Sequence, residues 1–306
     1  MLCHVALLIA IGAAATVTPV ALAAQFVIAD GATVGLVRAD GFLHPVATWR
    51  SGDWEPASGY DAGRDLVKLA PDVRGLPRDG WRFVPAGSDA ARPMAAGEAT
   101  TTRSHCQQVE GFATDVGRDA PERSWPQAKI GVALRSDVPF RRAEDVERQP
   151  DAASRRAAAL IVQIVHAMET HAIRGAAGAR LRSLDPSVRA GAAVRFVQFR
   201  RATTSGERHY FFEARKPYRG IPDHVFVSGW LVQTDRGDTR FGQLRSWIAG
   251  RGGETSFVTS IVHGVIALPN RVFWLVEDHG YEGERYAIVD LSRERGRIVE
   301  VPGGGC

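Results

Sequence analysis

The residues of this chain most capable of chemistry lie close together near its C-terminus. Residues 277–284 read EDHGYEGE and combine four carboxylates with a histidine. Carboxylate oxygens are the ligands that calcium prefers, and a pair of carboxyl groups supplies the acid and base of most glycosidases. The stretch therefore offers Glu277 and Asp278 as candidate catalytic residues, and Asp278, Glu282 and Glu284 as candidate metal ligands.

A solvent-exposed hairpin tip is the alternative interpretation of the same stretch, because charged residues and glycines are typical of such turns. Gly280 and Gly283 leave the turn flexible, and ordering a flexible turn costs entropy that weakens ion binding. The sequence thus predicts a weak calcium site at best. It predicts no other bound metal and no cofactor.

Glu213 is a further candidate acid, in a strand-like run of aromatic residues. Alternation along a strand places Glu213 and Phe211 on one face. A carboxyl group buried among aromatic rings acquires a raised pKa, as general acids require. The alternative is a partly buried carboxylate paired with Arg215 or Arg200.

Tryptophans are concentrated near the N-terminal end, where Trp49, Trp54 and Trp81 are candidate ligand-binding residues. Exposed indole rings form platforms for sugar rings. A small segment without disulfides also needs large apolar side chains for its core. The sequence favours the core.

Charge and motifs exclude several classes of function. The 38 basic residues are interleaved with 34 acidic ones and form no block of Lys or Arg, so no nucleic-acid partner is predicted. The chain contains no nucleophile elbow, no phosphate-binding loop and no dinucleotide fingerprint.

Residues 1–23 are predicted to be a cleavable signal peptide. Val5 to Ala15 is apolar but too short to span a bilayer, and Ala21 and Ala23 are the small residues that signal peptidase requires. We therefore expect a secreted or periplasmic protein with no transmembrane anchor after cleavage.

Two cysteines, Cys106 and Cys306, remain after removal of the signal. In an oxidising compartment such a pair is a candidate disulfide. The flexible tail Gly303–Gly305 is expected to let Cys306 reach its partner. The alternative is a loose tail with a free or intermolecular thiol.

Hydrophobic patterning predicts mostly strands. Val34 to Ala39 and Phe42 to Trp49 flank Asp40-Gly41, a turn typical of hairpins, and residues 25–84 are predicted to form a small β-meander domain. Residues 85–104 contain Pro and Gly and no aromatic residue, so a flexible linker is expected there.

Residues 105–306 are predicted to form an α+β domain. One amphipathic helix is expected between Asp151 and Gly175, because apolar residues recur there at helical spacing. Runs of hairpin-linked strands follow it. The predicted fold class is α+β: a mainly antiparallel β-sheet with one amphipathic covering helix, preceded by the small β-meander.

The function predicted from these features is that of an exported, non-enzymatic extracytoplasmic binding or envelope-associated protein, with a protein or polysaccharide partner. The alternative is a hydrolase of extracellular or cell-envelope polymers that uses Glu213 or the acidic residues 277–284. Convergence of these carboxylates in one concave pocket would favour the hydrolase.

Overall fold

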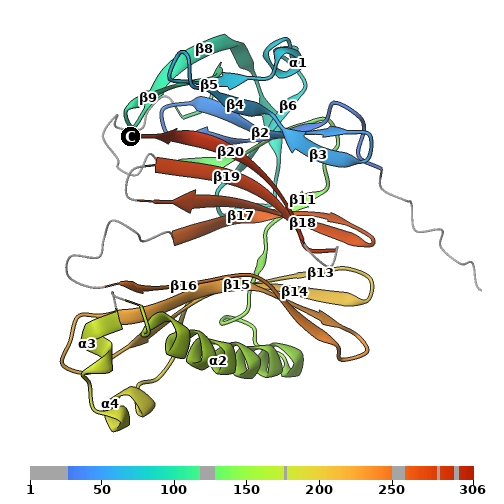
Figure 1. Cartoon of the computed structure of the whole chain (residues 1–306). Coiled ribbons are helices and arrows are strands. Elements are labelled where there is room, and N and C mark those ends of the chain that lie inside the picture. The colour runs from blue at the N-terminus through green and yellow to red at the C-terminus, as the bar shows by residue number, and fades with distance from the viewer. Residues whose placement is uncertain (1–26, 118–127, 176–177, 250–258, 281–282, 293–295) are drawn as a thin grey trace, which may run out of the picture.

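The computed structural model describes residues 27–117, 128–175, 178–249, 259–280, 283–292 and 296–306. The predicted signal peptide lies outside these residues. The architecture is α+β with mainly antiparallel sheets, as predicted. It consists of stacked layers: an N-terminal sheet, a middle sheet, a helix-covered sheet and the long helix α2 (Figure 1).

The N-terminal sheet has the strand order β4-β5-β9-β2-β1-β10-β6-β7, with β3 paired to β2 and β8 paired to β9. Its β1–β2 hairpin turns at Asp40-Gly41, as predicted, and Gly41 has a positive φ of 81°. The elements are β1 (Thr33–Arg38), β2 (Phe42–Arg50), β3 (Asp53–Pro56), β4 (Ser58–Asp61), β5 (Leu66–Leu69), α1 (Pro71–Arg74), β6 (Trp81–Pro85), β7 (Arg92–Met94), β8 (Ala96–Ser104), β9 (Gln107–Thr114) and β10 (Lys129–Arg135).

The sequence predicts a flexible linker at residues 85–104, but the structure has strand β8 there. Seven residue pairs join β8 to β9, from Ala96↔Thr114 to Ser104↔Gln107. Backbone hydrogen bonds to a neighbouring strand need no large apolar side chains, so composition alone underestimates order here. The N-terminal sheet consequently extends to Arg135 and does not end at residue 84.

Helix α2 (Ala152–Ala172) confirms the predicted helix. The Asp151 carboxylate accepts a hydrogen bond from the Ser154 amide at 2.7 Å and so caps the N-terminus. Its apolar face, including Ala157, Ile161 and Val165, packs on the helix-covered sheet. The short helices α3 (Ala179–Arg182) and α4 (Pro186–Ala190) follow it.

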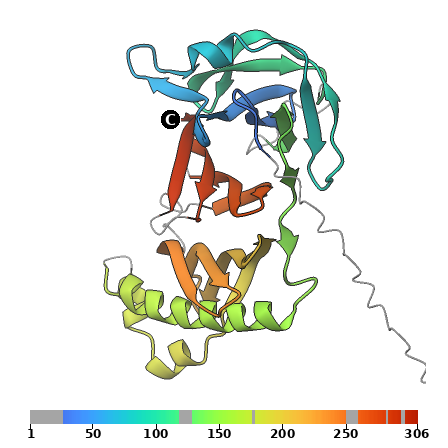
Figure 2. The same ribbon diagram turned by 90° about the vertical axis from the view of Figure 1, so that its right-hand side faces the viewer.

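The other two sheets are antiparallel meanders. After β10 the chain runs down one side of the stack and contributes a short edge strand to each sheet before it enters α2 (Figure 2). The middle sheet contains β11 (Phe140–Arg141), β17 (Thr259–Leu268), β18 (Arg271–His279), β19 (Gly283–Asp290) and β20 (Arg297–Gly305). The helix-covered sheet contains β12 (Glu144–Asp145), β13 (Arg195–Thr203), β14 (Glu207–Pro217), β15 (His224–Thr234) and β16 (Thr239–Ala249).

Apolar side chains fill the spaces between the layers. Trp49, Trp54 and Phe273 meet edge to face where the N-terminal sheet packs on the middle sheet. Phe211 and Trp274 belong to the core between the middle and helix-covered sheets. Because another layer packs on each face of the middle sheet, an ionisable residue that is buried on it must find a partner inside the protein.

The C-terminus is part of the middle sheet. Cys306 forms a disulfide with Cys106, and the Cys106 amide donates to the Gly305 carbonyl at 3.2 Å. The predicted pairing of Cys106 and Cys306 is confirmed, and the alternative of a loose tail is wrong, because Gly303 and Gly304 belong to β20. A Cβ atom at Gly303 would lie 2.6 Å from the Tyr286 ring, so this close approach requires glycine. Among the described residues, no helix is long and apolar enough to cross a membrane.

We expect the double variant Cys106→Ser/Cys306→Ser to lose about 4 to 5 kcal/mol of unfolding free energy. The bond joins residues 200 positions apart and so restricts most of the unfolded chain. Urea denaturation of the oxidised protein and the variant measures the loss. Intact mass should show a deficit of two hydrogens relative to the reduced form, and two readily alkylated thiols in the oxidised protein would contradict the prediction.

Candidate functional site

The candidate site lies where the N-terminal sheet meets the middle sheet. A cavity of about 540 Å³ is lined there by the β6–β7 connection, the start of β10, strands β17 and β18, and Arg200 of β13. The polar side chains that line it include Lys129, Arg142, Arg200, His263, Glu277 and His279. A cavity of this size accommodates a small organic molecule.

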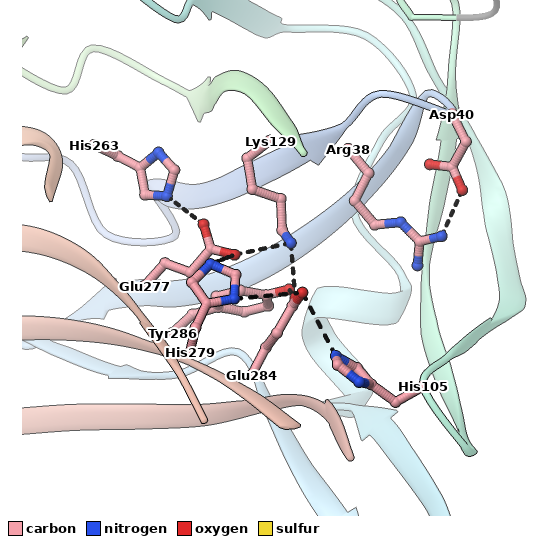
Figure 3. A network of polar contacts seen from close by, with 9 residues as sticks. All are labelled: Arg38, Asp40, His105, Lys129, His263, Glu277, His279, Glu284 and Tyr286. Carbon is pink, nitrogen blue, oxygen red and sulfur yellow. Dashed lines mark hydrogen bonds and ion pairs between the residues drawn. The ribbon is translucent and has the colours of Figure 1, made fainter. Parts of the chain in front are cut away.

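Beneath this cavity is a buried ionic network centred on Lys129 (Figure 3). The Lys129 ammonium lies 2.9 Å from a Glu277 oxygen and 2.7 Å from a Glu284 oxygen. Each of these three side chains is only 1% exposed. The network connects β10 of the N-terminal sheet with β18 and β19 of the middle sheet.

Histidines surround the two carboxylates. His263 Nε2 lies 2.7 Å from Glu277 Oε2, and His279 Nε2 lies 3.0 Å from Glu277 Oε1. His105 Nε2 lies 3.6 Å from Glu284 Oε1. The Tyr286 hydroxyl donates to Glu284 Oε2 at 2.6 Å.

The strand register assembles most of this network. Glu277 and His279 are two residues apart on β18 and therefore share a face. On β19 their partners across the ladder are Tyr286 and Glu284. His263 sits at a register shift between Val262 and Gly264, and a bulge of this kind redirects one side chain out of the regular alternation.

The partners of Glu277 and His279 shift the pKa of each group toward its charged form. Burial alone would raise the pKa of Glu277, but hydrogen bonds from His263 and His279 and the charge of Lys129 lower that pKa well below its usual value. Burial alone would lower the pKa of His279, but Glu277 and Glu284 raise it. A negatively charged Glu277 is therefore stabilised by the cations around it.

Two neighbouring groups are held neutral. Burial, followed by the charges of Lys129 and Arg38, lowers the pKa of His44 to about 3. Burial and the carboxylates of Glu284 and Glu277 raise the pKa of Tyr286 well above its usual value. The ring of Tyr286 packs edge to face on His44, with 4.8 Å between ring centroids.

The described acidic residues of the stretch 277–284 do not lie on an exposed tip. Glu277 and Glu284 are buried and lie on paired strands, together with His279. Asp278 points to the other face, where it accepts hydrogen bonds from the Ser260 hydroxyl at 2.6 Å and from Arg245 at 2.8 Å. Glu282 lies outside the described residues.

Glu213 does not line the cavity with Glu277. It lies between the helix-covered and middle sheets, where it accepts hydrogen bonds from the Ser260 amide at 2.7 Å and from Gln198 at 2.9 Å. The expected arginine partners are wrong, since these two groups hold Glu213. Burial raises its pKa to about 7.

The tryptophans lie in the core. Trp49 is 6% exposed, Trp54 1% and Trp81 2%. They form no exposed platform for a sugar ring, and their packing stabilises the N-terminal sheet.

Sequence reasoning missed Lys129, His105, His263 and Tyr286. A composition signal for Lys129 exists, because the chain contains 38 basic residues but only three lysines, Lys68, Lys129 and Lys216. Lys129 and Lys216 are both buried against glutamates. The histidines carry no such signal, because a bulge and long-range packing bring them to the site.

Comparison with models of known protein families, with curated proteins and with solved structures finds no match for this chain. Its function must therefore be inferred from its own geometry and chemistry.

We expect the stability of the protein to fall as pH rises from about 4.5 to about 7, through Glu213. Its pKa is about 7 in the folded state, against an ordinary value of 4.5. Glu213 therefore loses its proton at a lower pH in the unfolded chain, which stabilises the unfolded state relative to the folded state. The full effect is about 3 kcal/mol, complete above pH 7.

Glu213→Gln should remove this contribution, and chemical denaturation at several pH values measures it. The matched control is Glu147→Gln, at an exposed glutamate, which should keep the wild-type pH dependence. Parallel curves for wild type and Glu213→Gln would contradict the prediction.

Proposed function

We propose that this chain is an exported, non-enzymatic protein that binds a small anionic molecule in the cavity between its N-terminal and middle sheets. The ligand carries a carboxylate or phosphate group. The observation that carries this proposal is an excess of cationic groups on the cavity wall. Arg142, Arg200 and Lys129 line it, against the single carboxylate of Glu277.

The Glu277 carboxylate already has partners within the protein, which leaves the arginines to set the preference for a ligand. Lys129 and His263 both contact the Glu277 carboxylate. Arg142 donates one hydrogen bond to the Gly87 carbonyl at 2.8 Å, and a guanidinium group has five donors in all. Arg200 contacts Asp145 at 2.8 Å through one nitrogen and retains donors on its other nitrogens.

Export is supported by one feature of the sequence and one of the structure. The first 23 residues have the apolar run and small residues of a signal peptide. A disulfide between Cys106 and Cys306 suits an oxidising compartment outside the cytoplasm.

A hydrolase is the second candidate, favoured by the contact between His263 and Glu277 at the cavity wall. A carboxylate that accepts a hydrogen bond from one imidazole nitrogen fixes the histidine tautomer and increases its basicity. Against this candidate, Glu213 and Asp278 lie away from the cavity.

The binding proposal predicts that inorganic phosphate, citrate or glucuronate stabilises the protein and that glucose does not. Arg200→Gln should weaken binding at least tenfold, because one charge-assisted hydrogen bond is worth about 1.5 to 3 kcal/mol. Calorimetric titration at low and high salt measures the affinity, which should fall at high salt.

Arg148→Gln is the matched control, because Arg148 also contacts Asp145 but does not line the cavity. Equal losses in both arginine variants, or no binding of any of the three anions, would contradict the proposal. Turnover of oligomers of glucuronate by the wild type would favour the hydrolase instead.

A further inference from the structure

The cluster of Glu277, His279 and Glu284 has the composition and placement of a metal-ligand set. Each residue offers one ligand atom, and the three atoms lie within 4.8 Å of one another. The paired strands β18 and β19 hold all three on one face, since His279 and Glu284 are directly opposite in the ladder. Ligands on paired strands are positioned by the sheet, so the backbone need not rearrange to bring them together.

Both carboxylates also have partners that hold them in orientation. His263 contacts Oε2 of Glu277 at 2.7 Å, on the oxygen that does not face Lys129. The Tyr286 hydroxyl donates to Glu284 at 2.6 Å. Hydrogen bonds from a surrounding shell are typical of ligands in metal sites, where they fix the geometry and tune basicity.

The charge balance favours a cation with more than one positive charge. Two carboxylates are buried here and Lys129 supplies one positive charge, so the three groups together carry a net charge of −1. A divalent ion would balance both carboxylates by itself. Lys129 also lines the cavity, so an ammonium displaced by an ion would move toward that cavity.

The donor set selects the kind of ion. One imidazole nitrogen with two carboxylate oxygens suits zinc, whereas calcium prefers oxygen ligands alone. Ligand atoms around tetrahedral zinc lie about 3.4 Å apart, so a pair of ligand atoms at the 4.8 Å limit must close by about 1.4 Å. The Lys129 ammonium lies between the two carboxylates, 2.9 Å from Glu277 and 2.7 Å from Glu284, in the place that the ion would take.

We propose that Glu277, His279 and Glu284 bind one zinc ion per chain, and that the ion displaces the Lys129 ammonium into the cavity. Three protein ligands leave a fourth position open on the cavity side, because Glu277 and His279 line the cavity. The three ligands differ from Arg142 and Arg200, but Glu277 and His279 also line the cavity proposed to bind the anion, so the two sites share a wall.

The test is a titration of chelator-treated full-length protein with zinc by calorimetry, and with cobalt by visible absorption. We expect one ion per chain, with the cobalt bands of a low-coordinate site. His279→Ala and Glu284→Gln should each lower the affinity at least a hundredfold. The matched controls are His171→Ala and Glu147→Gln, at exposed positions, and both should bind as the wild type does.

The variant Lys129→Ala tests whether zinc displaces the Lys129 ammonium or whether this ammonium is the permanent cation of the site. If the ion displaces the ammonium, this variant should bind zinc at least tenfold more tightly than wild type, and zinc should raise its thermal midpoint more. Zinc binding by Lys129→Ala alone would overturn the proposal, because Lys129 would then be the resident cation.

Absence of zinc binding by both the wild type and Lys129→Ala would also overturn the proposal. So would a loss of zinc affinity in the His171→Ala control equal to that in the ligand variants. Circular dichroism of each variant checks folding, and loss of affinity in either His279→Ala or Glu284→Gln with an intact fold is sufficient support. Zinc binding without binding of phosphate, citrate or glucuronate would refute the proposed function and leave the metal site standing.

Discussion

The packing of the N-terminal sheet on the middle sheet depends on the contact of Lys129 with Glu277 and Glu284. A buried carboxylate without a counter-charge is costly, and removal of one partner from a buried ion pair costs about 3 to 5 kcal/mol. Lys129 comes from the N-terminal sheet and the glutamates from the middle sheet, so the charges are balanced only when the sheets are packed together. The network therefore specifies how one layer docks on the other.

The middle sheet is subject to the same constraint, that a buried charged group needs a partner. It is covered on both faces, so the ionisable side chains buried on it face another layer. Glu277 and Asp278 are adjacent in sequence, yet one meets Lys129 above and the other meets Ser260 and Arg245 below. Alternation along one strand thus distributes the acidic residues between two different polar networks.

The cavity and the ionic network are parts of one site, because Lys129, His263, Glu277 and His279 belong to both. A ligand in the cavity would lie against residues that already contact one another within the protein. Such a wall is preorganised, so little energy is spent on rearranging it when a ligand binds. The disulfide adds to this order, because Cys106 follows His105, which contacts Glu284.

The sequence by itself determined the local features, and only the tertiary structure decided the site. The cap at Asp151, the helical spacing through Val165, the Asp40-Gly41 hairpin and the α+β class follow from short-range preferences, and all are present in the structure. The burial of Glu277 could not be predicted, because it depends on Lys129, a partner far along the chain. Strand β8 pairs with the adjacent strand β9, and it was missed because its sequence lacks the large apolar side chains typical of strands. Lys129 and Glu284 are 155 residues apart, and no local pattern carries information about such a separation. Contacts of that range form only when whole sheets pack, which is a property of the complete fold.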